Sequence, residues 1–275
     1  SIKRAEAKEI ITSANNQLQK WMRLYSISSD NLKIVDDGTW AVIKLDYRGN
    51  TVLNRDSLFA ILHKDLNEWK VAANPEIVDY ASENHDYQQL INSADYVIAD
   101  GTGIVKASKR LKQPLPQRIP GIELLEECLK IAHVNQQKVF ILGSKNEIIE
   151  KAEQQLKAKY PRVTFAHHHG YINLKDETVI KRIETFNPDY IFVGMGYPKQ
   201  EKWIARHSKA FQHTVMMGVG GSFEVFSGAK KRAPKFFRKL NIEWVYRLLI
   251  DWKRLGRLKS IPKFMFKIAR QKRQR

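Results

Sequence analysis

Short apolar runs alternate with longer amphipathic segments along most of the chain after residue 70. The apolar runs predict strands at residues 71–74, 96–99, 138–144, 163–171, 190–193 and 214–219. The segments between them predict helices, most clearly at residues 76–91, 122–133, 148–156 and 176–186. Strands that alternate with helices in this way are typical of a largely parallel sheet covered on both faces. We therefore predict a Rossmann-like α/β fold.

The chain before this alternation has a weaker pattern. Residues 1–40 begin with a scattered helical periodicity and grade into a polar turn region, and a strand follows at 40–47. A helix capped by Asp56 or Ser57 would then run to about Trp69. We expect three parts: an N-terminal extension at 1–45 that packs or makes a homo-oligomer, an α/β core at 46–228, and a basic, amphipathic helical C-terminal appendage at 229–275.

Charge is concentrated in the C-terminal appendage. The whole chain has 275 residues and a formal net charge of +18, whereas residues 229–275 hold 17 Lys and Arg against Glu243 and Asp251, a net charge of +15. The core is therefore almost neutral. A basic tail of this kind is typical of a protein that binds nucleic acid or an anionic membrane surface, or it serves solubility alone.

Apolar residues in the appendage recur between the basic ones. Arg247, Arg254 and Arg257 share one helical face and alternate with Trp and Leu, and residues 261–268 add Ile, Phe and Met. Such a stripe is typical of an interfacial helix that binds anionic lipid. The alternative is a helix that packs on its own domain and leaves a solvated basic face.

The compartment follows from what the sequence lacks. A single cysteine, Cys128, excludes an intramolecular disulfide and suits a reducing cytosol. No N-terminal apolar run resembles a signal peptide, and no apolar stretch approaches the length of a membrane-spanning helix. We expect an intracellular protein.

Polar residues follow the predicted strands at their carboxyl ends. They are Asn74, Asp100, Ser144, His168 and Gln200. Because the carboxyl ends of parallel strands meet at one edge of the sheet, we expect a shared cleft there. Asp100, which is next to a glycine, could act as a general base for a hydroxyl group. The alternative is that its carboxylate caps the helix that follows.

The glycine-rich turns do not match a nucleotide-binding motif. Neither a GxGxxG run nor a GxxxxGK[ST] loop occurs, which argues against a dinucleotide or P-loop site. Gly143 and Ser144 enter a predicted helix, and the free N–H groups there would suit a phosphate or a ribose.

Two further features bear on a ligand site. His167, His168 and His169 invite a metal interpretation, but neighbouring residues on a strand point to opposite faces, and no acidic or cysteine partner lies at ligand spacing. One of these histidines could contact substrate instead. Arg118, in a loop flanked by prolines, could face an anion or simply lie on the solvated surface.

Several segments in fixed order resemble the WecG/TagA/CpsF family of glycosyltransferases. They are ANPE (73–76), ADGTGIVKAS (99–108), QRIPGIELLEECL (117–129), FILGS (140–144), PDYIFVGMGYPKQEKWI (188–204), the block from GVGGSF to EWVYRL (218–248) and the WKRLGR that follows (252–257). Together they cover roughly residues 70–260. PKQEKWI and the block that joins GGSF to RAP and EW are the most specific.

The resemblance implies a metal-independent, inverting enzyme without a cofactor. It would move N-acetylmannosamine, or its uronic acid, from a UDP-sugar to the 4-hydroxyl of GlcNAc in GlcNAc-diphosphoundecaprenol. Asp100 would be the catalytic base, and Arg247, Arg254 and Arg257 would close over the pocket and neutralise the UDP diphosphate. The substrate-binding residues would be Asn74, Arg118, Gly143, Ser144, His168, Gln200, Gly220 and Glu224. The enzyme would be cytoplasmic and peripheral on the inner face of the bacterial membrane, with no nucleic-acid partner.

Two positions depart from the family pattern. Ala72 stands where many members have a threonine, and Glu224 stands where an aspartate is common. Either change could alter which sugar is accepted. Three alternatives stay open: another UDP-sugar and lipid-diphosphate acceptor in capsule or exopolysaccharide synthesis, a basic nucleic-acid-binding protein, and an inactive envelope scaffold.

Overall fold

The structure of the protein is a computed structural model. It describes residues 32–36, 41–47, 50–51, 68–111, 115, 118–211, 213–234, 237, 243, 246 and 260–273. The chain divides into two compact units, Ser1–Lys64 and Asp65–Arg275. Each unit is described by itself.

The first unit contains a three-stranded antiparallel sheet. Its strands are β1 (Leu32–Asp36), β2 (Ala41–Tyr47) and β3 (Asn50–Thr51), in the order β1-β2-β3. The strand predicted at 40–47 is confirmed as β2, which spans the boundary expected between residues 45 and 46. The prediction of a turn region up to residue 40 is wrong over β1, because Leu32 to Asp36 pair with Leu45 to Ala41 across a short connection.

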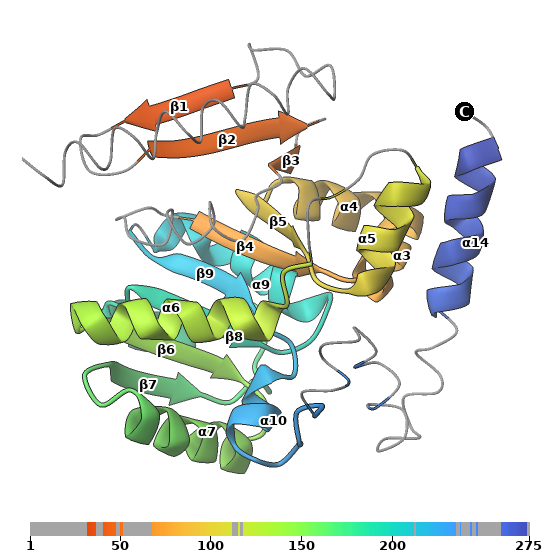
Figure 1. The fold of residues 1–275 in the computed structure, drawn as a ribbon. Coiled ribbons are helices and arrows are strands. Elements are labelled where there is room, and N and C mark those ends of the chain that lie inside the picture. The colour runs from red at the N-terminus through yellow and green to blue at the C-terminus, as the bar shows by residue number, and fades with distance from the viewer. Residues whose placement is uncertain are drawn as a thin grey trace, which may run out of the picture. The chain divides into compact units, whose positions relative to one another are not determined.

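The second unit is built on a six-stranded sheet in which every strand pair is parallel (Figure 1). The strands are β4 (Glu68–Ala73), β5 (Tyr96–Ala99), β6 (Lys138–Gly143), β7 (Thr164–His168), β8 (Tyr190–Gly194) and β9 (Val215–Gly218). Their order across the sheet is β5-β4-β9-β8-β6-β7. All six predicted strands are confirmed, and so is the α/β fold class.

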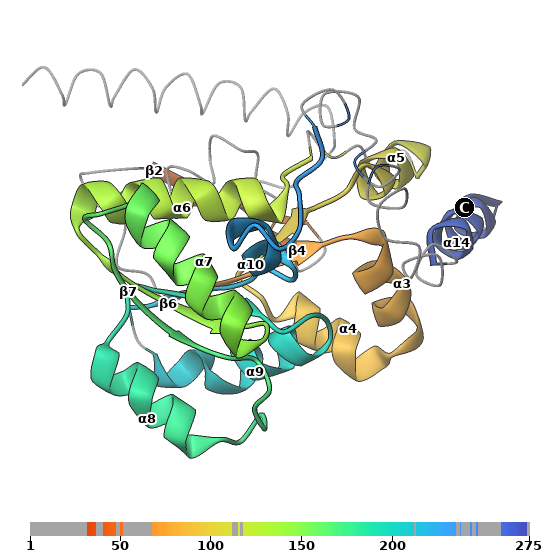
Figure 2. The same cartoon turned by 90° about the horizontal axis from the view of Figure 1, so that it is seen from below.

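Helices cover both faces of this sheet. The helices described in this unit are α3 (Pro75–Glu83), α4 (His85–Asn92), α5 (Thr102–Arg110), α6 (Gly121–Asn135), α7 (Asn146–Lys159), α8 (Glu177–Phe186), α9 (Lys199–His207), the 3-10 helix η2 (Ser208–Ala210), α10 (Ser222–Phe226) and α14 (Ser260–Arg273). Figure 2 shows α6, α7 and α10 on one face and α4, α8 and α9 on the other. Fully buried residues such as Phe140, Ile191 and Trp203 form the core between sheet and helices.

Two helix predictions are wrong in part. The helix capped by Asp56 or Ser57 was expected to reach Trp69, but Trp69 lies in β4, and residues 52–67 lie outside the described residues. The single helix predicted at 76–91 is two helices, α3 and α4. They are separated at Asn84, whose side chain accepts a hydrogen bond from the Tyr87 N–H at 2.9 Å and so starts α4.

The carboxyl ends of the strands lie at one edge of the sheet. Pairing in register brings Ala73 beside Ala99, and Gly143 beside Gly194. The polar residues predicted to share a cleft therefore leave the sheet at the same edge, as expected.

The helix α14 packs on α3 and α5 of the same unit. Phe264 and Ile268 are buried against Ala107, and Lys267 donates to Asp79 at 2.6 Å and to Glu83 at 2.8 Å. For this part of the C-terminal appendage the structure supports the second alternative, a helix packed on its own domain. Over the described residues, no helix is both long enough and apolar enough to cross a bilayer.

Candidate active site

Asp100 lies directly after β5. Its N–H donates to the Ala73 carbonyl oxygen at 2.8 Å, and its Oδ2 accepts from the Gly121 N–H at 3.2 Å. The alternative that Asp100 caps the following helix is wrong, because no side chain in the described part of the chain caps α5, which begins after Gly101. The carboxylate instead faces the first residue of α6, where the helix dipole favours a negative charge. Its side chain is 30% exposed, so a ligand can reach it.

Gly121 allows α6 to start this close to the sheet. A Cβ atom on Gly121 would lie 3.1 Å from the Ala72 Cβ and 3.3 Å from the Asp100 Oδ2. Contacts this short would push α6 away from the carboxylate. Ala72, one of the two departures from the family pattern, thus lies beside the start of α6.

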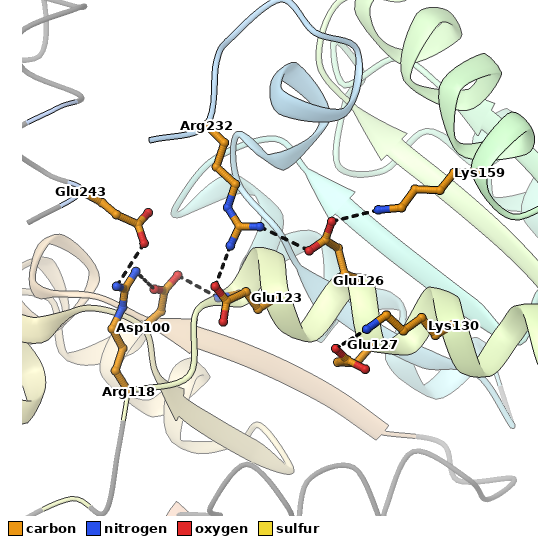
Figure 3. A network of polar contacts seen from close by, with 10 residues as sticks. Asp100, Arg118, Glu123, Glu126, Glu127, Lys130, Lys159, Arg232 and Glu243 are labelled. Atoms are coloured by element: carbon orange, nitrogen blue, oxygen red, sulfur yellow. Dashed lines mark hydrogen bonds and ion pairs between the residues drawn. The ribbon is translucent and has the colours of Figure 1, made fainter. Parts of the chain in front are cut away.

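Arg118 reaches Asp100 from the loop before α6, where the Ile119 N–H is bound to the Ala99 carbonyl oxygen at 2.9 Å. Its Nη2 lies 3.7 Å from Asp100 Oδ1, and its Nη1 donates to Glu243 Oε1 at 3.2 Å (Figure 3). The Arg118 side chain is 17% exposed. The alternative of a solvated surface arginine is therefore wrong, since Arg118 lies between two carboxylates.

Asn74 lies at the neighbouring strand end, after β4. Its Oδ1 accepts from the Ile77 N–H at 3.0 Å and caps α3. Pro75 then packs against Gly101 and the first turn of α5, where a Cβ on Gly103 would lie 2.7 Å from the proline Cγ. Close packing explains these glycines without a phosphate. A substrate contact for Asn74 stays a prediction.

Gly143 is the last residue of β6, Ser144 follows it, and both lie against the end of β8. The Ser144 N–H donates to the Gly194 carbonyl oxygen at 3.1 Å, and its hydroxyl donates to Glu224 Oε1 at 3.0 Å. The other oxygen of Glu224 is buried and has no partner among the described residues. A carboxylate here repels phosphate and accepts from hydroxyl groups, so the geometry favours a ribose or sugar hydroxyl over a phosphate.

The three consecutive histidines differ in their contacts, and the rings of His168 and His169 pack together with their centroids 4.3 Å apart. His167 Nδ1 lies 3.1 Å from Glu153 Oε2 on α7, and His168 Nδ1 lies 2.9 Å from the His169 carbonyl oxygen. Across the described ranges, no three His, Cys, Asp or Glu side chains are grouped closely enough to hold a metal ion. A substrate contact for His168 stays a prediction.

Gln200 is 5% exposed and lies under the turn that follows β9. Its Oε1 accepts from the Gly220 N–H at 3.1 Å, and its Nε2 donates to Glu201 Oε1 at 2.7 Å. Gln200 therefore holds the turn that Gly220 belongs to. Glu201 is 1% exposed, and burial raises its pKa above the ordinary value of 4.5. Direct contact of Gln200 or Gly220 with substrate stays a prediction.

A second charged cluster ties the start of the appendage to α6. Arg232 donates to Glu123 Oε1 at 2.7 Å and to Glu126 Oε2 at 3.3 Å (Figure 3). Glu126 also accepts from Lys159 of α7 at 3.1 Å. Beside the cluster lies a cavity of about 310 Å³, lined by Ile122, Glu126, Gln155, Leu156, Lys159, Val225, Phe226 and Arg232.

The structure therefore places the predicted site residues in two groups at one edge of the sheet. Asn74, Asp100 and Arg118 lie at the ends of β4 and β5, and the remaining described ones, Gly143, Ser144, His168, Gln200, Gly220 and Glu224, lie at the ends of β6 to β9. Arg247, Arg254 and Arg257 lie outside the described residues.

Sequence reasoning missed the contacts of Gly121 and Glu243. Each depends on a segment that the chain brings back from far along the sequence. One signal could have indicated Glu243, which is one of only two acids among the basic residues of the appendage.

Comparison with protein families matches residues 51–275 to the glycosyl transferase WecG/TagA/CpsF family. The chain is also 63% identical over 237 residues to an N-acetylglucosaminyldiphosphoundecaprenol N-acetyl-β-D-mannosaminyltransferase of Staphylococcus aureus strain NCTC 8325. The matched stretch covers 85% of this chain and 93% of the relative. The protein of the same name from strain MW2 is 62% identical over the same lengths.

Proposed function

The chain belongs to the WecG/TagA/CpsF family of glycosyltransferases, and we propose that it transfers N-acetylmannosamine from a UDP-sugar to the 4-hydroxyl of GlcNAc in GlcNAc-diphosphoundecaprenol. The names of the Staphylococcus aureus relatives support the sugar and the acceptor, since 85% of the chain is covered at 63% identity. The UDP donor and the inverting, metal-independent course come from the family resemblance.

One observation supports the chemistry most directly: the Asp100 carboxylate at the end of β5. It is partly exposed, and its other side is held by the Gly121 N–H and faces Arg118. A carboxylate fixed in this way can accept a proton from a hydroxyl group that approaches from the open side. Asp100 is therefore the proposed general base.

The proposed reaction is one displacement at the anomeric carbon. Asp100 takes the proton of the acceptor 4-hydroxyl while its oxygen forms the new bond to that carbon. The bond from the carbon to the UDP oxygen breaks on the opposite side, and its electron pair leaves with the diphosphate. Attack and departure on opposite sides invert the configuration. The negative charge that develops on UDP requires cations, which we assign to Arg247, Arg254 and Arg257.

The second group of residues suits the donor. Glu224 and Ser144 present a carboxylate and a hydroxyl group beside a helix start, and both groups can bind sugar or ribose hydroxyls. We propose that the donor lies across the ends of β6 to β9 and the acceptor hydroxyl lies near the end of β5. Because the proposed acceptor is a lipid, the protein would work as a peripheral protein on the inner face of the membrane.

A transfer assay with a lipid acceptor tests this function. Purified protein is incubated with a short-chain GlcNAc-diphospholipid and each of a panel of UDP-sugars, with and without EDTA. We expect UDP release and a disaccharide lipid from UDP-N-acetylmannosamine, only when acceptor is present and in both EDTA arms. Preferred turnover of another UDP-sugar supports the capsule or exopolysaccharide alternative. Activity that EDTA abolishes contradicts the metal-independent course.

A further inference from the structure

We propose that Glu243 is a positioning residue of the transfer site, which acts by holding Arg118 beside the Asp100 carboxylate. This inference rests on the proposed function. It means that the C-terminal appendage supplies an acidic residue to the site in addition to any cations. Glu243 and Arg118 are 125 positions apart in the sequence, yet their side chains are joined by a hydrogen bond of 3.2 Å.

The geometry indicates that Glu243, more than Asp100, sets the direction of the Arg118 guanidinium. The contact from Nη1 to Glu243 is a charge-assisted hydrogen bond, whereas Nη2 is 3.7 Å from Asp100, which is an ion pair without hydrogen-bond distance. Glu243 is also the more buried partner, with its side chain 7% exposed against 30% for Asp100. Electrostatic interactions are stronger where water is excluded.

The burial of Glu243 is unusual for its surroundings in the sequence. The appendage holds 17 basic residues and only two acids, so an acid there has many basic residues near it in the sequence. Glu243 instead is 5% exposed and contacts a residue of the core. A buried carboxylate without a cation is costly, and the ion pair with Arg118 offsets this cost.

Removal of this carboxylate should change the surroundings of the base. Without Glu243, the nearest anion described beside Arg118 is Asp100. A guanidinium that turns to Asp100 would bind both carboxylate oxygens in a fork, the favoured geometry for this pair. Asp100 would then be shielded from the acceptor hydroxyl and less able to take its proton. Glu243 thus keeps Arg118 close to Asp100 but prevents the guanidinium from binding both oxygens of the Asp100 carboxylate.

The test compares Glu243→Gln with wild type in the transfer assay, with kcat and donor KM measured separately. Glutamine keeps the size and removes the charge. We expect kcat to fall roughly 10- to 100-fold, because small displacements at a reacting centre have effects of that size. Donor KM should change less than about threefold, since the base and the donor site belong to different groups of residues.

Two further variants separate positioning from folding. Glu243→Asp keeps the charge on a shorter side chain, and we expect it to recover much of the lost kcat. Glu127→Gln is the matched control, because it removes a carboxylate from the exposed pair with Lys130 on α6, and it should keep kcat within about twofold. All variants are assayed well below their melting midpoints, measured by circular dichroism.

The outcomes distinguish this inference from the proposed function. Wild-type protein that transfers no N-acetylmannosamine contradicts the proposed function. Wild-type transfer with an unchanged kcat in folded Glu243→Gln overturns the role of Glu243 alone. Equal loss in Glu243→Gln and Glu243→Asp also overturns it, because the carboxylate would then not be the feature that matters.

Discussion

Among the described residues, two of the contacts between the C-terminal appendage and the core have opposite charge arrangements. At the first, Glu243 of the appendage meets Arg118 of the core, and both side chains are largely buried. At the second, Lys263 and Lys267 of α14 meet Asp79 and Glu83 of α3, and three of these four side chains are a third or more exposed. Water weakens the second contact much more than the first. The first contact is therefore suited to fix a catalytic group, and the second to hold a helix in place.

The difference extends to what each contact touches. Arg118 contacts both Glu243 and Asp100. A substitution at the buried contact should therefore alter the surroundings of the proposed base and lower the transfer rate. The α14 contact ends on α3, whose N-cap is Asn74, but the two acids that meet α14, Asp79 and Glu83, lie further along the helix. We expect changes there to affect the attachment of α14 and to leave the transfer rate almost unaltered.

The largest effect is expected at the far end of the buried contact. Asp100→Asn keeps an oxygen that can accept from the Gly121 N–H but removes the basic group, so transfer should fall about 10² to 10⁴-fold. The measurement is the initial rate of acceptor-dependent UDP release. Asp86→Asn, an exposed acid in the first turn of α4, serves as control and should keep wild-type rates. Full activity of Asp100→Asn would mean that another group takes the proton.

Arg232 tests how the stabilisation by an ion pair depends on burial, because its exposure is intermediate between those of the two contacts. Its side chain is 20% exposed and bridges Glu123 and Glu126. Arg232→Gln should lower the free energy of unfolding by about 1–2 kcal/mol, because two charge-assisted hydrogen bonds are lost in a partly solvated place. Urea unfolding measures this. Lys130→Gln, at an exposed pair on the same helix, should change it by less than about 0.5 kcal/mol. Equal effects would contradict the importance of burial.

Glu201 sharpens the comparison, because it is buried like Glu243 but has the Gln200 amide as its hydrogen-bond partner instead of a cation. Burial raises its pKa above 4.5. Below that pH, folded and unfolded chains both keep the proton. As the pH rises above it, the unfolded chain loses the proton first, so this group lowers stability progressively.

The corresponding variant is Glu201→Gln, which cannot titrate. Relative to wild type, it should gain about 1 kcal/mol of unfolding free energy between pH 5 and pH 8. Urea unfolding at the two pH values gives the difference. Glu127→Gln should show no gain of this kind, since its carboxylate is paired with Lys130 at the surface. If the gain is absent in Glu201→Gln, the buried carboxyl is stabilised by more than the Gln200 amide.

Much of the core could be predicted from the sequence because its signals are local. The strand before Asp100 is a short apolar run, and the turn after it is marked by Gly101 and Gly103. The parallel fold then places that strand end at the same edge as Ser144 without any knowledge of contacts. The break between α3 and α4 was missed because Asn84 alone does not show whether it caps a helix or lies inside one.

The partners of the site residues could not be predicted, because they depend on how segments return in space. Asp100 contacts the start of α6 only because Gly121 has no side chain there. The hydrophobic periodicity of the sequence does not indicate how closely the helix approaches the carboxylate. Arg118 lies between two carboxylates only because Glu243 arrives from the appendage. In the same way, the apolar residues Phe264 and Ile268 fit a lipid surface and a protein surface equally well, and only the acids on α3 distinguish the two.

The smallest effect is expected at the exposed end of the α14 contact. Lys263 lies 2.7 Å from Glu83, and the two side chains are 49% and 52% exposed. Lys263→Gln should therefore lower the hydrogen-exchange protection of the α14 amides only about two- to fivefold. Lys267→Gln should lower it more, because the partner Asp79 is 9% exposed. Phe264→Ala should lower it at least about tenfold through lost apolar burial.

Salt and acid should act on the same contact in a defined direction. Raising NaCl to 1 M screens the exposed pair and should reproduce the Lys263→Gln loss in wild type, with little further loss in the variant. Hydrogen bonds from Lys263 and Lys267 lower the pKa of Glu83 from 4.5 to about 2. The contact is therefore complete above pH 4.5 and weakens as the pH falls toward 2. If the protection factors of the α14 amides change neither with salt nor with acid, the apolar contacts of Phe264 and Ile268 alone hold α14 on the core.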